Sequence, residues 1–394
     1  MSSYDFFTIA IRPESPFCLG GRQFKENLFD SETIISGGVI KGAIASTWRM
    51  LLDKGPNCEI IDGFDKKRPE LSSCLDKIRI THAFPVDRSS EKRPVVFPHS
   101  LVKGVGGTLK DVALHKEYDM VDGAAPAFAV DWKEYDDVFT RFGWPHVKKE
   151  LRVRTALCRS YRKAANKQLF AYEMVVPDGL EWLATIDLSN VTDATKSDIE
   201  DRRFREAAKS QLIDLLLHGL HGWSKTKSSA TVSISECTLD TEPVMVDEEY
   251  YIVTLQTPAL LIKPGSLDET SGQVQLEAVY NEAWNQLSDN NLQLHNFFAR
   301  QSLAGGYYLH KRFRGNKEYY PWLLTDAGSV FVFKATDTEK AKKIIREWLR
   351  YGLPLPKDVS KDGNTWKNCP FIPENGYGEI MLTKELLKPK EGDK

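Results

Sequence analysis

The sequence predicts an α+β protein of two successive domains, each built in the order strand, helix, two strands, helix, strand. Three observations favour this class: residues 4–12 alternate between apolar and polar side chains, residues 199–217 and 338–351 have an apolar stripe at helical spacing, and a glycine-containing loop and a strand follow each of those helices. The 394 residues, 41% hydrophobic and 27% charged, suffice for two or three domains with buried cores.

The first domain begins with a strand and then a glycine turn that leads into a helix. Ser36-Gly37-Gly38 precedes a stretch in which Ile40, Ile44 and Trp48 share one helical face. Two strands are expected to form a hairpin around the turn at residues 177–179, and a second helix and a last strand follow. The expected elements are strand 4–12, helix 40–52, strands 169–174 and 181–188, helix 199–217 and strand 230–235.

The second domain repeats this order. Its expected elements are strand 250–256, helix 274–287, strands 293–298 and 329–334, helix 338–351 and strand 379–382. The shared order is the split β-α-β, ferredoxin-like arrangement, and we interpret the chain as a divergent tandem duplication. The first domain is assigned to residues 1–240, with a large insertion at about 54–149 where no period is evident, and the second to residues 247–394.

Composition excludes several classes of protein. No apolar run approaches the ~20 residues of a membrane-spanning helix. The first residues show neither the basic region nor the apolar stretch of a secretory signal. The six cysteines form no CxxC pair and the eight histidines show no metal-binding spacing. We therefore expect a reduced, cytoplasmic protein that needs no metal or other cofactor.

The charges are segregated although they nearly cancel in sum, at −2. Residues 148–167 hold eight basic side chains and one acid, and residues 300–317 hold five basic side chains and no acid. Such segregation can present a basic face to nucleic acid. The alternative is that these runs are simply solvated surface.

Candidate RNA-binding residues come from the basic runs, the first helix and the glycine loops. Arginines that alternate along a strand can bind successive phosphates. Aromatic side chains interleaved with lysine and arginine can stack on nucleobases. The alternatives are glycine turns that the fold itself requires, helix capping by Ser36 and a polar hairpin at residues 305–315. The candidates for phosphate contact are Lys41, Arg49, Arg154, Arg159, Lys163, Lys225, Lys227, Lys311, Arg312 and Arg314, and the candidates for stacking are Tyr307 and Tyr377.

His218 and His221 lie at the expected end of a helix. Such a pair could serve as acid and base in metal-independent RNA cleavage. Histidine at the last turn of a helix is also favoured electrostatically without any catalytic role.

Four passages, in this order, resemble the RAMP superfamily of CRISPR-associated proteins, above all the tandem two-domain, Cas5-like subunit of type III-D effector complexes. The resemblance spans nearly the whole chain, although the loop after Gly222 carries serine and lysine where that family carries more glycine. The passages are residues 35–49; Arg154-Thr155-Ala156 followed by residues 164–170; Gly305-Gly306-Tyr307 with residues 327–333; and residues 374–379.

The resemblance implies two ferredoxin-like domains related to the RNA-recognition fold. It implies a non-catalytic subunit of an antiviral ribonucleoprotein, one that holds the repeat-derived 5′ handle of the guide RNA and caps the complex. Its partners would be the large polymerase-like subunit, backbone RAMP subunits and, indirectly, target RNA. Two alternatives stay open: a metal-independent endoribonuclease that processes the guide precursor, and an assembly protein that contacts protein partners alone.

Overall fold

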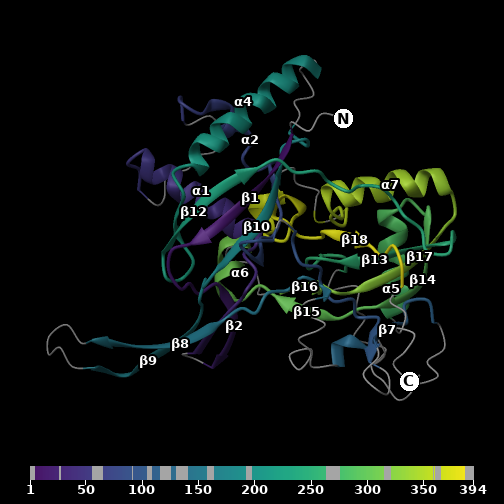
Figure 1. The fold of residues 1–394 in the computed structure, drawn as a ribbon, viewed down its shortest axis with the longest axis horizontal. Helices are drawn as coiled ribbons and strands as arrows, with labels where there is room; N and C mark the ends of the chain where they lie inside the picture. Colours follow the sequence, from purple (N-terminus) through teal and green to yellow (C-terminus); the bar gives the residue numbers. More distant parts are fainter. Residues whose placement is uncertain are drawn as a thin grey trace. The chain divides into compact units, whose positions relative to one another are not determined.

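The computed structural model divides the chain into two compact units (Figure 1). The first consists of Met1–Pro94 and Gly143–Thr238, and the second of Val95–Phe142 and Leu239–Lys394. The structure describes residues 5–25, 28–55, 65–90, 92–103, 109–115, 126–129, 141–157, 164–191, 198–262, 276–314, 321–357, 359 and 365–386. No helix in these ranges is long and apolar enough to span a membrane.

The first unit is built on an antiparallel sheet with helices on one face. Its strands run in the order β11-β12-β1-β10-β4, with β5 also paired to β10. Ile9, Trp48, Trp182 and Leu212 belong to the core that fills the space between sheet and helices. The elements are β1 (Phe6–Pro13), β4 (Arg79–Ile80), β5 (Phe84–Asp87), β10 (Leu180–Asp187), β11 (Leu220–Trp223) and β12 (Ser228–Ser235), with helices α1 (Gly37–Leu51), α2 (Pro69–Cys74) and α4 (Asp198–Leu216).

A second sheet of the first unit has the strand order β2-β3-β9-β8 and is here called the accessory sheet. Its long strands β8 and β9 run side by side in Figure 1. The expected hairpin around residues 177–179 is wrong, because β9 pairs with β8 and β3 whereas β10 pairs with β1, β4 and β5. Trp182, Ala184 and Ile186 draw β10 into the main core. The strands are β2 (Gly20–Lys25), β3 (Leu28–Ser31), β8 (Lys149–Leu157) and β9 (Ala164–Val175).

The second unit has an antiparallel sheet in the order β14-β17-β13-β18. Helices α5 and α7 cover one face, where Trp284 packs against Phe331, Phe333 and Trp348. The elements are β13 (Tyr250–Leu255), α5 (Leu276–Leu287), β14 (Leu292–Phe298), β15 (Gln301–Ala304), α6 (Tyr307–Arg314), β16 (Trp322–Thr325), β17 (Val330–Ala335), α7 (Thr338–Tyr351), α8 (Thr365–Asn368) and β18 (Ile380–Leu382), with a 3₁₀ turn at Pro373–Asn375.

The other face of this sheet is covered by a segment from the middle of the expected insertion. Val102, Val112 and Ala113 pack against Val330 and Val332. The His99 amide donates to the Gly328 carbonyl at 2.7 Å, and the Asn296 side chain donates to the carbonyls of Ala113 and His115. Residues 95–142 therefore group with the second unit, although the sequence assigned them to the first domain. This segment holds β6 (Leu101–Lys103), β7 (Leu109–Asp111) and a 3₁₀ turn at Ala127–Ala129.

The two main sheets share one strand order. If the four strands of each repeat are numbered along the chain, both sheets place them in the order 2-3-1-4. In the first unit strand 2 is β4 together with β5, and β10, β1 and β12 follow across the sheet. In the second unit the order is β14, β17, β13, β18. All neighbouring strands on these paths are antiparallel. The mixed α+β class with antiparallel sheets is confirmed, and it is consistent with ferredoxin-like folds.

Gly328 offers a test of how the segment around Phe97 and His99 is attached to the second sheet. Its φ is +87°, and an added Cβ would lie 2.6 Å from the Phe97 carbonyl oxygen and 2.8 Å from His99 Cε1. We expect Gly328→Ala to lower the free energy of unfolding by about 1–3 kcal/mol, because both the backbone conformation and the packing become strained. Urea denaturation measures this. Gly306→Ala is the control, since nothing lies within 4 Å of its Cβ position, and equal stability of the two variants would contradict the prediction.

Candidate nucleic-acid interface

A row of two aromatic rings between two cations lies on one face of the accessory sheet. The rings of Phe29 and Tyr172 stack with centroids 5.3 Å apart and planes 15° from parallel. Lys225 Nζ lies 3.7 Å from the centroid of the Phe29 ring, and the guanidinium carbon of Arg154 lies 5.9 Å from that of Tyr172. We call these four residues the cation–aromatic row. Its members are far apart in sequence, and all belong to the first unit.

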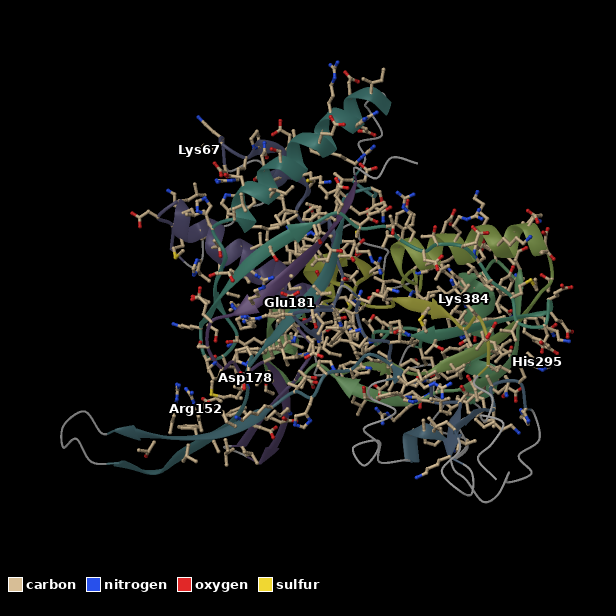
Figure 2. The ribbon with its side chains drawn as sticks, in the orientation of Figure 1. Lys67, Arg152, Asp178, Glu181, His295 and Lys384 are labelled. Atoms are coloured by element: carbon tan, nitrogen blue, oxygen red, sulfur yellow. The ribbon has the colours of Figure 1, made fainter. Side chains whose placement is uncertain are left out.

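Strand register explains why these side chains share a face. Arg152 lies opposite Tyr172 and Arg154 opposite Phe170 across β8 and β9, while Phe29 lies beside Tyr172 in the parallel pairing of β3 with β9. Directly opposed residues point to the same side of a sheet, and successive residues point to opposite sides. Arg152, which pairs with Glu150 at 2.6 Å, is labelled in Figure 2, where it projects from the β8–β9 ribbon.

The tight turn between β11 and β12 supplies the lysine of the row. The Lys225 amide donates to the Cys18 carbonyl at 3.0 Å, which holds the turn against the chain that leads into β2. Ser224 and Lys227 have φ values of 66° and 52°, so the turn reverses sharply. Burial lowers the pKa of Lys225. Lys227 is exposed in the same turn.

The opposite face of the accessory sheet has a different character. Leu151 and Val153 are 62% and 57% exposed there. Lys149 bridges the carboxylates of Asp30 and Glu173 at 2.8 and 3.0 Å. An open hollow of about 430 Å³ is lined by Leu28, Asp30, Lys149, Glu150, Leu151 and Glu173. Phosphates would meet two carboxylates on this side, so the cation–aromatic row marks the face suited to nucleic acid.

The main sheets offer less to a base. The outer face of the second sheet is covered by Val102, Val112 and Ala113, as described above. On the outer face of the first sheet, Phe84 is completely buried next to Trp144, and the Arg93 guanidinium lies 4.4 Å from its ring centroid. On the second sheet, Tyr250 is partly exposed next to His295 and Lys334, but Lys334 is paired with Glu249. The accessory sheet instead has two partly exposed rings side by side with a cation at each end.

The other predicted candidates are scattered. Lys41, on α1, donates to the Asp76 carbonyl at 3.3 Å, and Arg49 lies half-buried at the end of the same helix. Lys311 and Arg312 are exposed on α6, so residues 307–314 form a helix and not a polar hairpin. Outside the described residues lie Arg159 and Lys163, together with the side chains of Tyr307 and Arg314.

The terminal glycine loop has its backbone amides engaged within the protein. The amides of Gly376, Tyr377 and Gly378 donate to the carbonyls of Pro373, Ile372 and Pro258, and the Glu379 amide donates to the Thr257 hydroxyl. Tyr377 is half-buried, with its ring edge-on to Phe371 at 5.1 Å. The loop is therefore built as an internally bonded turn.

The glycine loop of the first unit, which begins at Gly222, is part of a β-hairpin. Gly222 lies in β11, where the pairing with β12 has a bulge between His221 and Trp223. An added Cβ at Gly222 would lie 3.0 Å from Ser46 Oγ, and φ there is +69°. Gly222 thus serves the close approach of β11 to α1.

Both ring nitrogens of His221 have partners inside the protein. Nε2 lies 2.9 Å from the His218 carbonyl and Nδ1 lies 3.0 Å from the Ser229 hydroxyl. A carbonyl oxygen only accepts, so Nε2 carries a proton, while Nδ1 is held by the Ser229 hydroxyl. This arrangement fixes the ring as a structural link between α4, β11 and β12. In the part of the chain that we describe, no cluster of His, Cys, Asp or Glu could hold a metal ion.

Sequence reasoning missed Phe29 and Tyr172. The signal for Tyr172 was present, because Phe170 and Tyr172 alternate along β9 in step with Arg152 and Arg154 on β8. Phe29 gave no comparable signal, since its place depends on the long-range pairing of β3 with β9.

No family model matches the sequence, and neither does any curated protein. Among solved structures, the chain is similar to a chain of the type III-B Cmr-beta complex bound to cognate target RNA and AMPPnP, at 13% identity and a TM-score of 0.46, over 96% of this chain and 98% of that one. A chain of the Csm3-Csm4 subcomplex of the type III-A CRISPR-Cas interference complex matches at 15% identity and a TM-score of 0.36, over 84% and 94%. A type IV-B CRISPR complex chain gives 11% and 0.29, over 60% and 92%.

The ion network on the opposite face predicts a pH dependence. Burial raises the pKa of Asp30, but hydrogen bonds that include that of Lys149 outweigh it, so the pKa stays below the usual 3.8. A carboxylate with a depressed pKa stabilises the fold above its unfolded pKa, and that contribution is lost as the pH falls through the folded value.

We therefore expect Asp30→Asn to lower the free energy of unfolding by about 0.2–1 kcal/mol at pH 7, with a gap that narrows below about pH 4. Urea titrations of both proteins across this range measure the effect. A gap that stayed constant with pH would contradict the assignment of Asp30 as the titrating partner.

Proposed function

We propose that this chain is a non-catalytic, RNA-binding subunit of a RAMP-type CRISPR effector ribonucleoprotein, and that it holds single-stranded guide RNA on the accessory sheet. The observation that carries the proposal is the cation–aromatic row, in which Lys225, Phe29, Tyr172 and Arg154 meet on one sheet face. Rings that stack on bases, with cations at both ends for phosphates, are what sequence-tolerant binding of a single strand requires.

The fold supports the same proposal. We infer that the two main sheets are tandem ferredoxin-like domains derived by duplication, because they share strand order and orientation and carry helices on one face. The accessory sheet is then an addition to the first domain, formed by β2 and β3 before α1 and by β8 and β9 before β10.

The finer role follows from the sequence resemblance to the type III-D, Cas5-like subunit. In that role the strand held on the accessory sheet is the repeat-derived 5′ handle, and the chain caps the complex beside the large subunit and a backbone RAMP subunit. A short RNA of uniform 5′ end that copurifies with the chain would support this role.

Tyr172 is the sharpest test of stacking. We expect Tyr172→Ala to weaken binding of a short single-stranded RNA by about 1–3 kcal/mol, or roughly 5- to 150-fold, because one base loses its platform. Tyr172→Phe keeps the ring and should bind like the parent chain. Fluorescence anisotropy with a labelled repeat-derived RNA measures both. If the alanine and phenylalanine variants bound equally well, Tyr172 would not be a stacking platform.

Arg154 is the matching test of phosphate contact. We expect Arg154→Gln to weaken RNA binding and to reduce the slope of log affinity against log salt by about 0.7, the value for one phosphate contact on a single strand. Arg346→Gln is the control, because it removes the same charge from a 49% exposed arginine on α7 of the other unit, where Arg346 is paired with Glu242. Equal slopes for the two variants would exclude a phosphate contact by Arg154.

Absence of catalysis can be tested directly. We expect the purified chain to leave repeat RNA intact in EDTA, because the ring nitrogens of His221 are both engaged. Site-specific cleavage that His221→Ala abolishes would establish the endoribonuclease instead. Crosslinking that yields protein adducts but no RNA adducts would establish the assembly protein.

A further inference from the structure

Strand β8 forms an open edge of the accessory sheet. In the order β2-β3-β9-β8 it lies last, and among the described residues it pairs with β9 alone. It is nine residues long, and alternate residues of an edge strand direct N–H and C=O groups away from the sheet. Such an edge is a template for a further strand.

The edge also carries apolar side chains into solvent. Leu151 and Val153 occupy alternate positions on the face opposite the cation–aromatic row and are 62% and 57% exposed. Leu28 and Leu151 are the apolar residues that line the hollow of about 430 Å³ on that face. Exposed apolar side chains beside an unpaired edge favour a protein partner over solvent.

Charge selects the partner. Arg152, Arg154 and Glu150 share one face of β8 and sum to +1. Lys149 lies on the other face, where it is paired with Asp30 and Glu173. Two copies of this strand side by side would place +1 against +1 on the face of Arg152, and like charges across a strand pair are destabilising. The edge therefore disfavours a second copy of this chain and favours a strand that carries acidic residues.

Register fixes the pattern of that strand. A residue placed beside Arg152 lies on the face of Arg152, and its two neighbours lie on the face of Leu151 and Val153. We propose that β8 is a docking edge for an extended segment of a partner protein whose side chains alternate between apolar and acidic. The apolar side chains of this segment would lie on the face opposite the cation–aromatic row, and its acidic side chains on the face that holds Arg152 and Arg154. The edge and the exposed leucine and valine are present whether or not the other face binds RNA.

Synthetic peptides test this with the full chain. One peptide alternates valine and glutamate, a second replaces glutamate with lysine, and a third is the glutamate peptide with N-methyl groups on the backbone nitrogens of one edge. We expect the glutamate peptide to bind, the lysine peptide to bind at least about tenfold more weakly, and the methylated peptide to lose binding. Calorimetry or anisotropy gives the affinities.

Variants locate the peptide on β8. The double variant Leu151→Thr, Val153→Thr leaves the charge unchanged and should weaken binding of the glutamate peptide about tenfold, as about 1.4 kcal/mol of apolar contact is lost. Leu303→Thr is the control, because Leu303 is 71% exposed on β15 of the other unit. Affinity for single-stranded RNA should stay at the parent value in the double variant, so this test and that of RNA binding can fail separately.

Several results would overturn the proposal. They are absence of binding by the glutamate peptide, equal binding of the glutamate and lysine peptides, or binding that the double variant leaves unchanged. A parent chain that sediments as a dimer and becomes a monomer in the double variant would show that the edge takes a second copy instead.

Discussion

The pairing of β9 with both β3 and β8 is the interaction on which the candidate interface depends. It brings the short strand of residues 28–31 beside a hairpin formed more than a hundred residues later. Because side chains alternate along each strand, one register decides that Phe29, Tyr172 and Arg154 point to the same face. A slip of one residue would turn the rings to the side of Asp30 and Glu173. The parallel register of β3 with β9 is therefore the local constraint with the largest consequence.

The same alternation gives the accessory sheet two faces of different chemistry. One face holds rings and cations; the other holds Leu151, Val153 and the ion network of Lys149 with two carboxylates. A base that covered the aromatic pair would remove apolar area from water, and so would a partner strand that covered the leucine and valine. Charge then separates the two ligands, since phosphates are repelled by the carboxylates on one side and attracted by the cations on the other.

Elements with a strong local period could be predicted from the sequence, and elements set by distant partners could not. The apolar spacing of Ile40, Ile44 and Trp48 located α1, and the alternation of residues 4–12 located β1. The turn at residues 177–179 was recognised, but turn chemistry does not tell which strands pair across it, and Trp182 and Ile186 give β10 a better burial in the main core. The placement of residues 95–142 depends on contacts such as His99 with Gly328, which no local pattern reveals.

The candidate residues follow the same division. Arg154 was found because a charge run is visible in a sequence, and Lys225 because it follows the glycine of a loop. Phe29 lies in a polar stretch and becomes significant only through its neighbours. Tyr377 looked available because glycines flank it, yet those glycines allow the tight turn whose amides are bonded to Ile372, Pro373 and Pro258. Glycine next to an aromatic residue thus has two structural causes, and hydrogen-bond partners distinguish them. Where the amides are engaged internally, only side chains are left to contact a phosphate or a base, and the proposed interface on the accessory sheet is made of the side chains of four distant residues.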